Sequence, residues 1–330
     1  MYQPEIYGIV LSFMIISMFC WGSWANTLKL CPKFRFQLYY WDYVIGLLLG
    51  ACIWGLTLGS FGSTGQRFLV DIASASSRTF LLAFMGGVVF NVANLLLVAA
   101  IDIAGLAVAF PIGIGLALVV GAVSSYLITP KGNPLLLFGG IALVVAAIAF
   151  DAIAYRIREA NKAAMSRRGI VISLIAGVLM GCFYPCVSAA MTGADPVGPY
   201  AAVLFLALGV LVCAIPFNWL LMRKPLDGGR ATSIGEYFQA PVSFHFWGVL
   251  GGAIWCTGTV LNFVSSQAHI VGPAVSYSIG QGATMISACW GVFVWREFAT
   301  APSPSRIFLA WMFVLFLSGL TAVAVAPLFS

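Results

Sequence analysis

The sequence predicts an all-α membrane protein with ten transmembrane helices, arranged as two inverted five-helix repeats. Three observations support this fold class: the composition, a series of long apolar stretches, and an internal sequence repeat. Of the 330 residues, 62% are hydrophobic and only 8% are charged, whereas soluble domains carry about 25% charged residues. So few charges cannot cover a soluble surface, which argues against a soluble enzyme, a nucleic-acid-binding domain or a disulfide-stapled secreted module.

Ten apolar stretches are long enough to cross a membrane. A bilayer core about 30 Å thick requires about 20 residues of helix, and each stretch meets this length. The first is expected to be retained as a helix, because it lacks a basic leader and is too long for the apolar region of a signal peptide. The expected spans are Tyr7–Leu28, Leu38–Leu58, Thr79–Ile101, Ala104–Leu127, Pro134–Ile153, Ile170–Met191, Tyr200–Met222, Ser243–Val264, Val271–Trp295 and Arg306–Pro327.

The basic residues predict the orientation of these spans. Loops that follow odd-numbered spans contain thirteen of the sixteen Lys and Arg residues, and the opposite side contains only Arg67, Arg78 and Lys131. Because basic residues remain on the cytoplasmic side, both termini are expected to face outward from an inner or plasma membrane. The net charge of +6 therefore reflects topology, and no nucleic-acid partner is expected.

The chain is expected to consist of two halves of similar sequence with five spans each. Because five is an odd number, the second half starts on the opposite side of the membrane and is inverted relative to the first. Gly105–Gly115 (GLAVAFPIGIG) and Gly272–Gly282 (GPAVSYSIGQG) are identical at six of eleven positions, and Gly86–Gly87 corresponds to Gly251–Gly252. Inverted repeats are typical of alternating-access transporters, which hold the solute near the midplane. The predicted division is 1–155 for the first repeat, 156–168 for a basic cytoplasmic linker and 169–330 for the second repeat.

Polar and aromatic side chains recur inside several spans. Asn91 and Asn94 share one helix face, and Trp255, Thr259 and Asn262 follow the i, i+4, i+7 spacing of a single stripe. Amides beside aromatic faces suit a neutral planar or ring-shaped polar solute, although hydrogen bonding and packing between helices would use the same residue types. The candidate solute-binding residues are Trp21, Asn91, Asn94, Phe110, Tyr184, Trp255, Asn262, Tyr277 and Gln281.

The acidic residues indicate no proton relay in the middle of the membrane, because none of the ten, Asp151 included, lies deep in an expected span. Asp42 lies one turn inside the second span, where it can pair with Lys29 or complement a helix N-terminus. Asp102 lies between the third and fourth spans, and Glu297 follows the ninth. Asp42, Asp102 and Glu297 are the candidates for proton coupling or gating, and facilitated transport stays open as well.

The sequence lacks the motifs of enzymes and metal sites. It has no phosphate-binding Gly-Lys-Ser/Thr loop and no set of nucleophile, histidine and acid. Nearly all of the eight cysteines lie in apolar runs, where they act as small hydrophobic residues. With His245 and His269 as the only histidines, no zinc site is expected. We therefore expect no catalysis, no cofactor and no metal.

Several short motifs resemble one group of transporters. Phe19–Ala25 (FCWGSWA), Tyr40–Tyr43 (YWDY) and Gln281 with Trp290–Phe298 resemble the ureide permeases. The chain is similar, over its whole length, to that family and to its neighbours, the glucose/ribose porters and rhamnose–proton symporters, within the drug/metabolite transporter superfamily. Pro111–Val119 resembles the sugar porters, and Cys182–Pro185 the rhamnose symporters. The resemblance implies ten helices and outward termini, but the chain lacks the long central loop of plant ureide permeases.

The sequence therefore predicts a secondary transporter that imports a small neutral polar solute by alternating access. Ureides or nucleobases are the leading substrates, and sugars of the glucose, ribose or rhamnose type are the alternative. A drug or metabolite exporter would be expected to carry a deep acidic residue, and a membrane enzyme or receptor-like scaffold a reactive site or a soluble domain. The expected partners are the solute, the lipid bilayer and, if transport is coupled, protons; the sequence sets no oligomeric state.

Overall fold

The computed structural model is helical across the residues it describes, which are 1–158, 166–193, 195–226 and 228–329. Helices suit an apolar chain in lipid because each backbone N–H and C=O finds its partner within the same segment. The helices are α1 (Tyr7–Ser23), α2 (Asn26–Lys29), α3 (Phe36–Leu56), α4 (Phe68–Ser74), α5 (Ser77–Ala104), α6 (Leu106–Ile128), α7 (Pro134–Arg158), α8 (Arg167–Thr192), α9 (Pro199–Arg223), α10 (Ile234–Phe238), α11 (Val242–Ser266), α12 (Pro273–Gly280), α13 (Ala283–Cys289), the π-helix η1 (Trp290–Val294), α14 (Ser303–Val325) and the 3₁₀-helix η2 (Ala326–Phe329).

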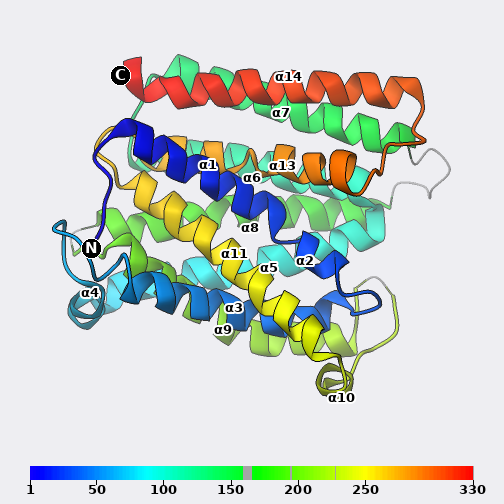
Figure 1. Cartoon of the computed structure of the whole chain (residues 1–330), viewed down its shortest axis with the longest axis horizontal. Helices are drawn as coiled ribbons and strands as arrows, with labels where there is room; N and C mark the ends of the chain where they lie inside the picture. The colour runs from blue at the N-terminus through cyan, green and yellow to red at the C-terminus, as the bar shows by residue number, and fades with distance from the viewer. Residues whose placement is uncertain (159–165, 194, 227, 330) are drawn as a thin grey trace.

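The long helices form one bundle with two distinct edges (Figure 1). Helices α7 and α14 pack together along one edge, and α3 and α9 pack together along the opposite edge. Helices α1, α5, α6, α8, α11 and α13 lie between them (Figure 1). Both chain termini lie at the end of the bundle that carries α4, whereas α2 and α10 lie at the other end.

Nine helices in the described part of the chain are long and apolar enough to cross a membrane. They match nine of the ten expected spans. The expected ninth span, Val271–Trp295, is not one continuous helix: α12 ends at Gly280, a turn follows, and α13 then leads into η1. In this turn the Gly282 N–H bonds to the Ile279 carbonyl, three residues back, at 3.0 Å. This tighter turn interrupts the α-helical pattern.

The fourth and ninth spans begin in the same way. Gly105 precedes α6 with φ 81° and ψ 156°, and Gly272 precedes α12 with φ 80° and ψ 167°. Only glycine adopts this backbone conformation without strain. The two residues also occupy the first position of the internal sequence repeat, so the repeated sequence is accompanied by a repeated local backbone.

Two helix crossings depend on the absence of a side chain. A Cβ on Gly46 or Gly252 would collide with a backbone carbonyl oxygen across the α3–α11 crossing. A Cβ on Gly87 or Gly209 would likewise collide with a backbone carbonyl oxygen across the α5–α9 crossing. Small residues allow such close approach of membrane helices, and the two crossings place matching glycines on helices of both halves.

The fifth span is longer than the sequence indicated. Helix α7 continues to Arg158, past the expected end at Ile153, so Asp151 lies about two turns inside it. Residues 159–165, the greater part of the expected 156–168 linker, lie outside the described residues.

Candidate functional site

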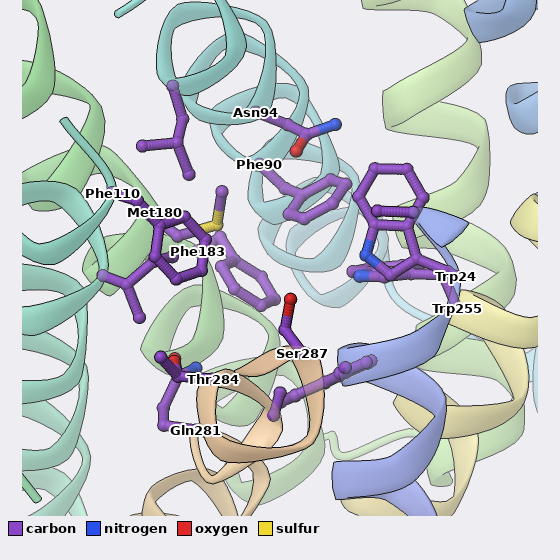
Figure 2. A pocket seen from close by; sticks show the side chains of 16 residues that line it. Trp24, Phe90, Asn94, Phe110, Met180, Phe183, Trp255, Gln281, Thr284 and Ser287 are labelled. Atoms are coloured by element: carbon purple, nitrogen blue, oxygen red, sulfur yellow. The ribbon is translucent and has the colours of Figure 1, made fainter. Parts of the chain in front are cut away.

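A cavity of about 150 Å³ lies between helices of both halves of the chain (Figure 2). A mostly apolar hollow with a few polar groups is the usual form of a small-molecule site. The lining residues are Trp21, Gly22, Trp24, Ala25, Phe90, Asn94, Leu97, Phe110, Ile114, Met180, Phe183, Trp255, Gln281, Ala283, Thr284 and Ser287.

Aromatic rings form much of the wall. Trp21 and Trp255 stack with their centroids 6.3 Å apart, and Phe90 lies 4.3 Å from Trp255 and 5.2 Å from Phe183. The Trp21 ring is oriented by its Nε1–H, which donates to Thr259 Oγ1 at 3.1 Å. Rings that fix one another in this way present flat faces on which a ring-shaped solute can stack.

Polar groups enter the cavity from two sides. Figure 2 shows Asn94 on one side, and Gln281, Thr284 and Ser287 on the other. The Asn94 amide donates to the Tyr40 hydroxyl at 3.4 Å. No described residue forms a hydrogen bond with the side chain of Gln281, Thr284 or Ser287. Their donors and acceptors are therefore available to a solute.

The interruption between α12 and α13 determines where these polar groups lie. Gln281 occupies the turn itself, and Thr284 and Ser287 follow at three-residue intervals on α13, which places the three close to one face. Interrupted helices whose ends meet at the solute are a recurring feature of transporters, and π-helical segments such as η1 occur frequently at functional sites.

Five of the nine residues predicted from the sequence line this cavity. They belong to spans one, three, four, eight and nine, so the structure brings together residues from distant parts of the chain. They are Trp21, Asn94, Phe110, Trp255 and Gln281.

Tyr184 and Asn262 are buried outside the cavity lining and bond to the protein itself. The Tyr184 hydroxyl donates to Asn262 Oδ1 at 2.6 Å. Asn262 Nδ2 donates to the Ser276 carbonyl at 2.9 Å and to Ser17 Oγ at 3.2 Å. This network connects α8, α11, α12 and α1, and it uses the polar atoms that the sequence assigned to a solute.

Asn91 and Tyr277 also lie outside the cavity lining. Asn91 accepts a hydrogen bond from the Tyr40 hydroxyl at 2.9 Å, and the Tyr277 hydroxyl donates to the Ala117 carbonyl at 3.3 Å. Both side chains are fully buried. Both side chains therefore form hydrogen bonds between helices. This is the alternative to solute binding that the sequence left open.

Sequence reasoning overlooked several lining residues because most of them are apolar. One signal was available: Phe90 occupies the place of Trp255 when Gly86–Gly87 is aligned with Gly251–Gly252, and the two rings touch in the structure. The lining residues outside the nine candidates that have the largest side chains or polar groups are Trp24, Phe90, Met180, Phe183, Thr284 and Ser287.

Asp42 has other partners than the sequence suggested. It accepts a hydrogen bond from the Tyr237 hydroxyl at 2.6 Å, and its other oxygen lies 2.8 Å from His245 Nδ1. Lys29 instead pairs with Glu297 at 2.8 Å. The reason is that α2 lies against the end of η1, where the Trp295 Nε1–H donates to Asn26 Oδ1 at 2.7 Å.

Glu297 lies at the centre of an ion-pair cluster at the end of the bundle that carries α2. Its carboxylate contacts Lys29 Nζ at 2.8 Å, Arg158 Nη1 at 3.0 Å and the Tyr155 hydroxyl at 3.2 Å. Partial burial opposes ionisation, but the hydrogen bonds and charges of Lys29 and Arg158 outweigh it and lower the pKa of Glu297 below its ordinary value. Asp102, the third acidic candidate, is exposed in the last turn of α5.

In the part of the chain that the structure describes, no three His, Cys, Asp or Glu side chains gather in a way that could hold a metal ion. The cysteines are free thiols. The aromatic and polar residues that line the cavity offer stacking and hydrogen bonding to a solute.

A family model described as sugar transport protein matches residues 13–326. The chain belongs to the sugar transport protein family. Ureide permease 1 and ureide permease 2 of Arabidopsis thaliana are 22% and 23% identical to this family member, over 98% of both chains in each case. A putative sugar uptake protein, YxfA, of Lactococcus lactis subsp. lactis (strain IL1403) is 22% identical over 96% of this chain and 98% of its own.

One crystal structure superposes on 96% of both chains with a TM-score of 0.65 at 13% identity, which shows the fold alone. The family and its relatives confirm the resemblance to the ureide permease and sugar porter group. This sugar transport family member is a transporter of small polar solutes and not an enzyme. Its many apolar helices make it a multi-pass integral membrane protein.

Proposed function

We propose that this transporter imports a small neutral polar solute, with ureides or nucleobases as the leading class, and that the solute binds in the central cavity. The observation that carries the proposal is the unpaired set of Gln281, Thr284 and Ser287, which faces aromatic rings across a space of about 150 Å³. A planar, amide-rich ring would stack on Trp255 or Phe90 and exchange hydrogen bonds with these groups.

The lining favours a neutral solute. No Lys, Arg, His, Asp or Glu is among the described residues that line the cavity. A charged solute would lose its hydration there without meeting an opposite charge, which is costly in a low-dielectric site. This argues against a drug-cation exporter.

A sugar is the second candidate, and two observations favour it. The matching family is described as sugar transport protein, and one relative is a putative sugar uptake protein. Trp21 and Trp255 can stack on the apolar face of a sugar ring, and Asn94 and Gln281 can bond to its hydroxyl groups. The cavity suits both classes, so measured uptake has to distinguish them.

Transport would proceed by alternating access between two inverted repeats, 1–155 and 169–330. Three features support this mechanism. Gly105 and Gly272 begin equivalent spans in the same conformation, and the close α3–α11 crossing has its counterpart in α5–α9. In addition, the cavity lies where the two halves meet, as expected for rocking transporters.

We propose that both termini lie outside an inner or plasma membrane. The basic residues support this orientation, because thirteen of sixteen follow odd-numbered spans. Lys29 and Arg158 then face the cytoplasm, and their ion pairs with Glu297 would close the cytoplasmic end in this conformation. Glu297 is better suited to gating than to carrying a proton, because its lowered pKa keeps it ionised near neutral pH.

Uptake into proteoliposomes tests the proposal. The purified protein is supplied with labelled allantoin, uracil, glucose, ribose or rhamnose, and saturable entry is recorded for each. Entry of allantoin or uracil supports the leading class, whereas entry of sugars alone replaces it by the alternative. Entry of none contradicts import.

Gln281→Ala should abolish saturable uptake while leaving the protein folded, because it removes the amide from the interrupted span. Thr321→Ala is the matched control, since its hydroxyl is on the exposed face of α14 and bonds only to its own helix. Unchanged kinetics in Gln281→Ala would place the site elsewhere.

A further inference from the structure

Asp151 has no role in the transport mechanism described so far. It lies in α7, and its side chain is only 5% exposed. Its Oδ1 is buried and has no hydrogen-bond partner among the described residues. Burial of an ionised carboxylate without a partner is very costly, so this environment favours the uncharged carboxylic acid.

Asp151 lines a small cavity that adjoins the central one. This second cavity, of about 40 Å³, is lined in part by Asp151 and Tyr155 of α7 and by Phe110, Thr284 and Ser287. The last three residues also line the central cavity. A single layer of side chains therefore separates the carboxyl from the proposed solute position, and Thr284 and Ser287 can respond to both.

On its other side, Asp151 is connected with the cytoplasmic end of the bundle. Tyr155 lies one turn further along α7 and donates to Glu297 Oε2 at 3.2 Å. Arg158, one turn further still, binds the same oxygen at 3.0 Å. Hydrogen-bonding groups thus extend from the second cavity to the exposed ion-pair cluster.

The ionisable groups near Asp151 act in opposite directions. A positive charge such as that of Arg158 attracts a carboxylate, whereas a negative charge such as that of Glu297 repels it. Arg158 is already paired with Glu297, which reduces its influence. Helix α6 presents Phe110 and Pro111 to the second cavity, and α13 presents neutral side chains. The other ionisable groups on these helices are Tyr126 on α6, Tyr155 and Arg156 on α7, Cys289 on α13 and Arg306 on α14. The Arg306 guanidinium bonds to the Ala299 carbonyl.

We propose that Asp151 is a proton-binding site whose protonation is linked to occupancy of the central cavity; this rests on the proposed function, in which the solute binds there. A proton from the outside bonds to a carboxylate oxygen of Asp151 before the solute enters the cavity. When the cavity opens to the cytoplasm, that O–H bond breaks and the proton passes to water at the Glu297 cluster. One proton then crosses with each solute molecule, and nothing is oxidised or reduced.

Proteoliposomes that contain a trapped pH-sensitive dye test the coupling, with allantoin, uracil and glucose as probes. For the wild type we expect an inward proton gradient to accelerate entry several-fold, and entry to acidify the interior. Asp151→Asn should retain solute exchange but lose both the acceleration and the acidification. Asp151→Glu should keep them, and Asp195→Asn, at an exposed position between α8 and α9, is the matched control. Full gradient response in Asp151→Asn would overturn the proposal.

Infrared difference spectroscopy tests the proton site without any solute. The wild type minus Asp151→Asn spectrum at neutral pH should contain the C=O band of a carboxylic acid that shifts in heavy water. A missing band would overturn the proton site. Failure of every probe to enter the wild type would instead contradict the proposed function, while the band still decides whether Asp151 holds a proton.

Discussion

The fourth and ninth spans share a repeated sequence but contribute differently to the cavity. Both start at a glycine of the same conformation, but α6 continues unbroken to Ile128, whereas the ninth span is interrupted at Gln281. At equivalent positions, α6 contributes Phe110 and Ile114, and the ninth span places Tyr277 outside the cavity lining and Gln281 in it. One copy thus supplies an apolar wall and the other a polar wall.

The difference shows that a repeated backbone need not give a symmetric site. Phe90 and Trp255, which are equivalent residues in the sequence repeat, are in contact with their ring centroids 4.3 Å apart and their planes tilted by 32°, so the aromatic part of the cavity is shared between the halves. The unpaired polar groups on the interrupted span come from the second half alone. If the solute binds in this cavity as we propose, its specificity depends on the positions at which the two spans differ.

The largest expected effect concerns the crossings that the two halves share. In Gly252→Ala, the new methyl group would collide with the Tyr43 carbonyl. We expect this variant to lower the free energy of unfolding by roughly 1–3 kcal/mol. Gly87→Ala should behave alike if the crossings are equivalent. Gly139→Ala is the control, because nothing lies within 4 Å of its Cβ, and it should stabilise the helix by roughly 0.5–1 kcal/mol. Thermal unfolding in detergent measures all three; equal tolerance at Gly252 and Gly139 would contradict the close contact.

A second pair of variants tests the divergence of the copies. Phe110→Ala should raise the KM for the transported solute about tenfold, because stacking on an aromatic ring contributes about 0.5–1.5 kcal/mol. Tyr277→Phe, at the equivalent position, should leave KM unchanged and lower stability by about 1 kcal/mol, through loss of its bond to the Ala117 carbonyl. A larger change in KM for Tyr277→Phe than for Phe110→Ala would reverse our assignment of the two walls.

The smallest effect concerns the segments that follow the two spans. After η1 the chain carries Glu297 in its ion-pair cluster, whereas after α6 it carries Lys131, which donates to the His269 carbonyl at 3.0 Å. Glu297→Gln should lower stability near neutral pH by about 1 kcal/mol or less, as is usual for exposed pairs.

The pH dependence of this effect has a defined sign. Because the pKa of Glu297 is lowered in the folded state, its stabilisation is present above the ordinary carboxyl pKa and is lost as pH falls through the lowered value. Unfolding of the wild type should therefore approach that of Glu297→Gln below about pH 4. A constant difference between the two proteins down to acidic pH would show that the ion pairs do not stabilise the fold.

The sequence was a good guide to the helices because lipid leaves few alternatives for a long apolar segment. It could not reveal the interruption of the ninth span, since Gln281 and Gly282 do not by themselves end a helix and Val271–Trp295 contains no charged residue. It also misjudged Asp151, because apolarity ends at Ile153 while α7 continues to Arg158. Because the helix ends five residues later than expected, Asp151 is a buried residue within the helix and not a peripheral one near its end.

The candidate site was predictable where polar residues happen to face the centre. Asn91 and Asn94 are three residues apart, yet only Asn94 lines the cavity while Asn91 bonds to Tyr40. Spacing along one helix identifies a shared face, but the packing of the neighbouring helices decides what each part of that face meets. Phe183 gave no signal, because an apolar ring in an apolar span is compatible with any role.

Gly105 differs from the crossing glycines in a way that concerns chirality. A Cβ there would meet nothing within 4 Å, so space for a side chain is present and only the sign of φ excludes one. For the mirror-image amino acid this conformation lies at the edge of its extended region. Semisynthesis with D-alanine at Gly105 should therefore preserve the start of α6, which L-alanine would strain: this turn is specified by handedness and not by volume.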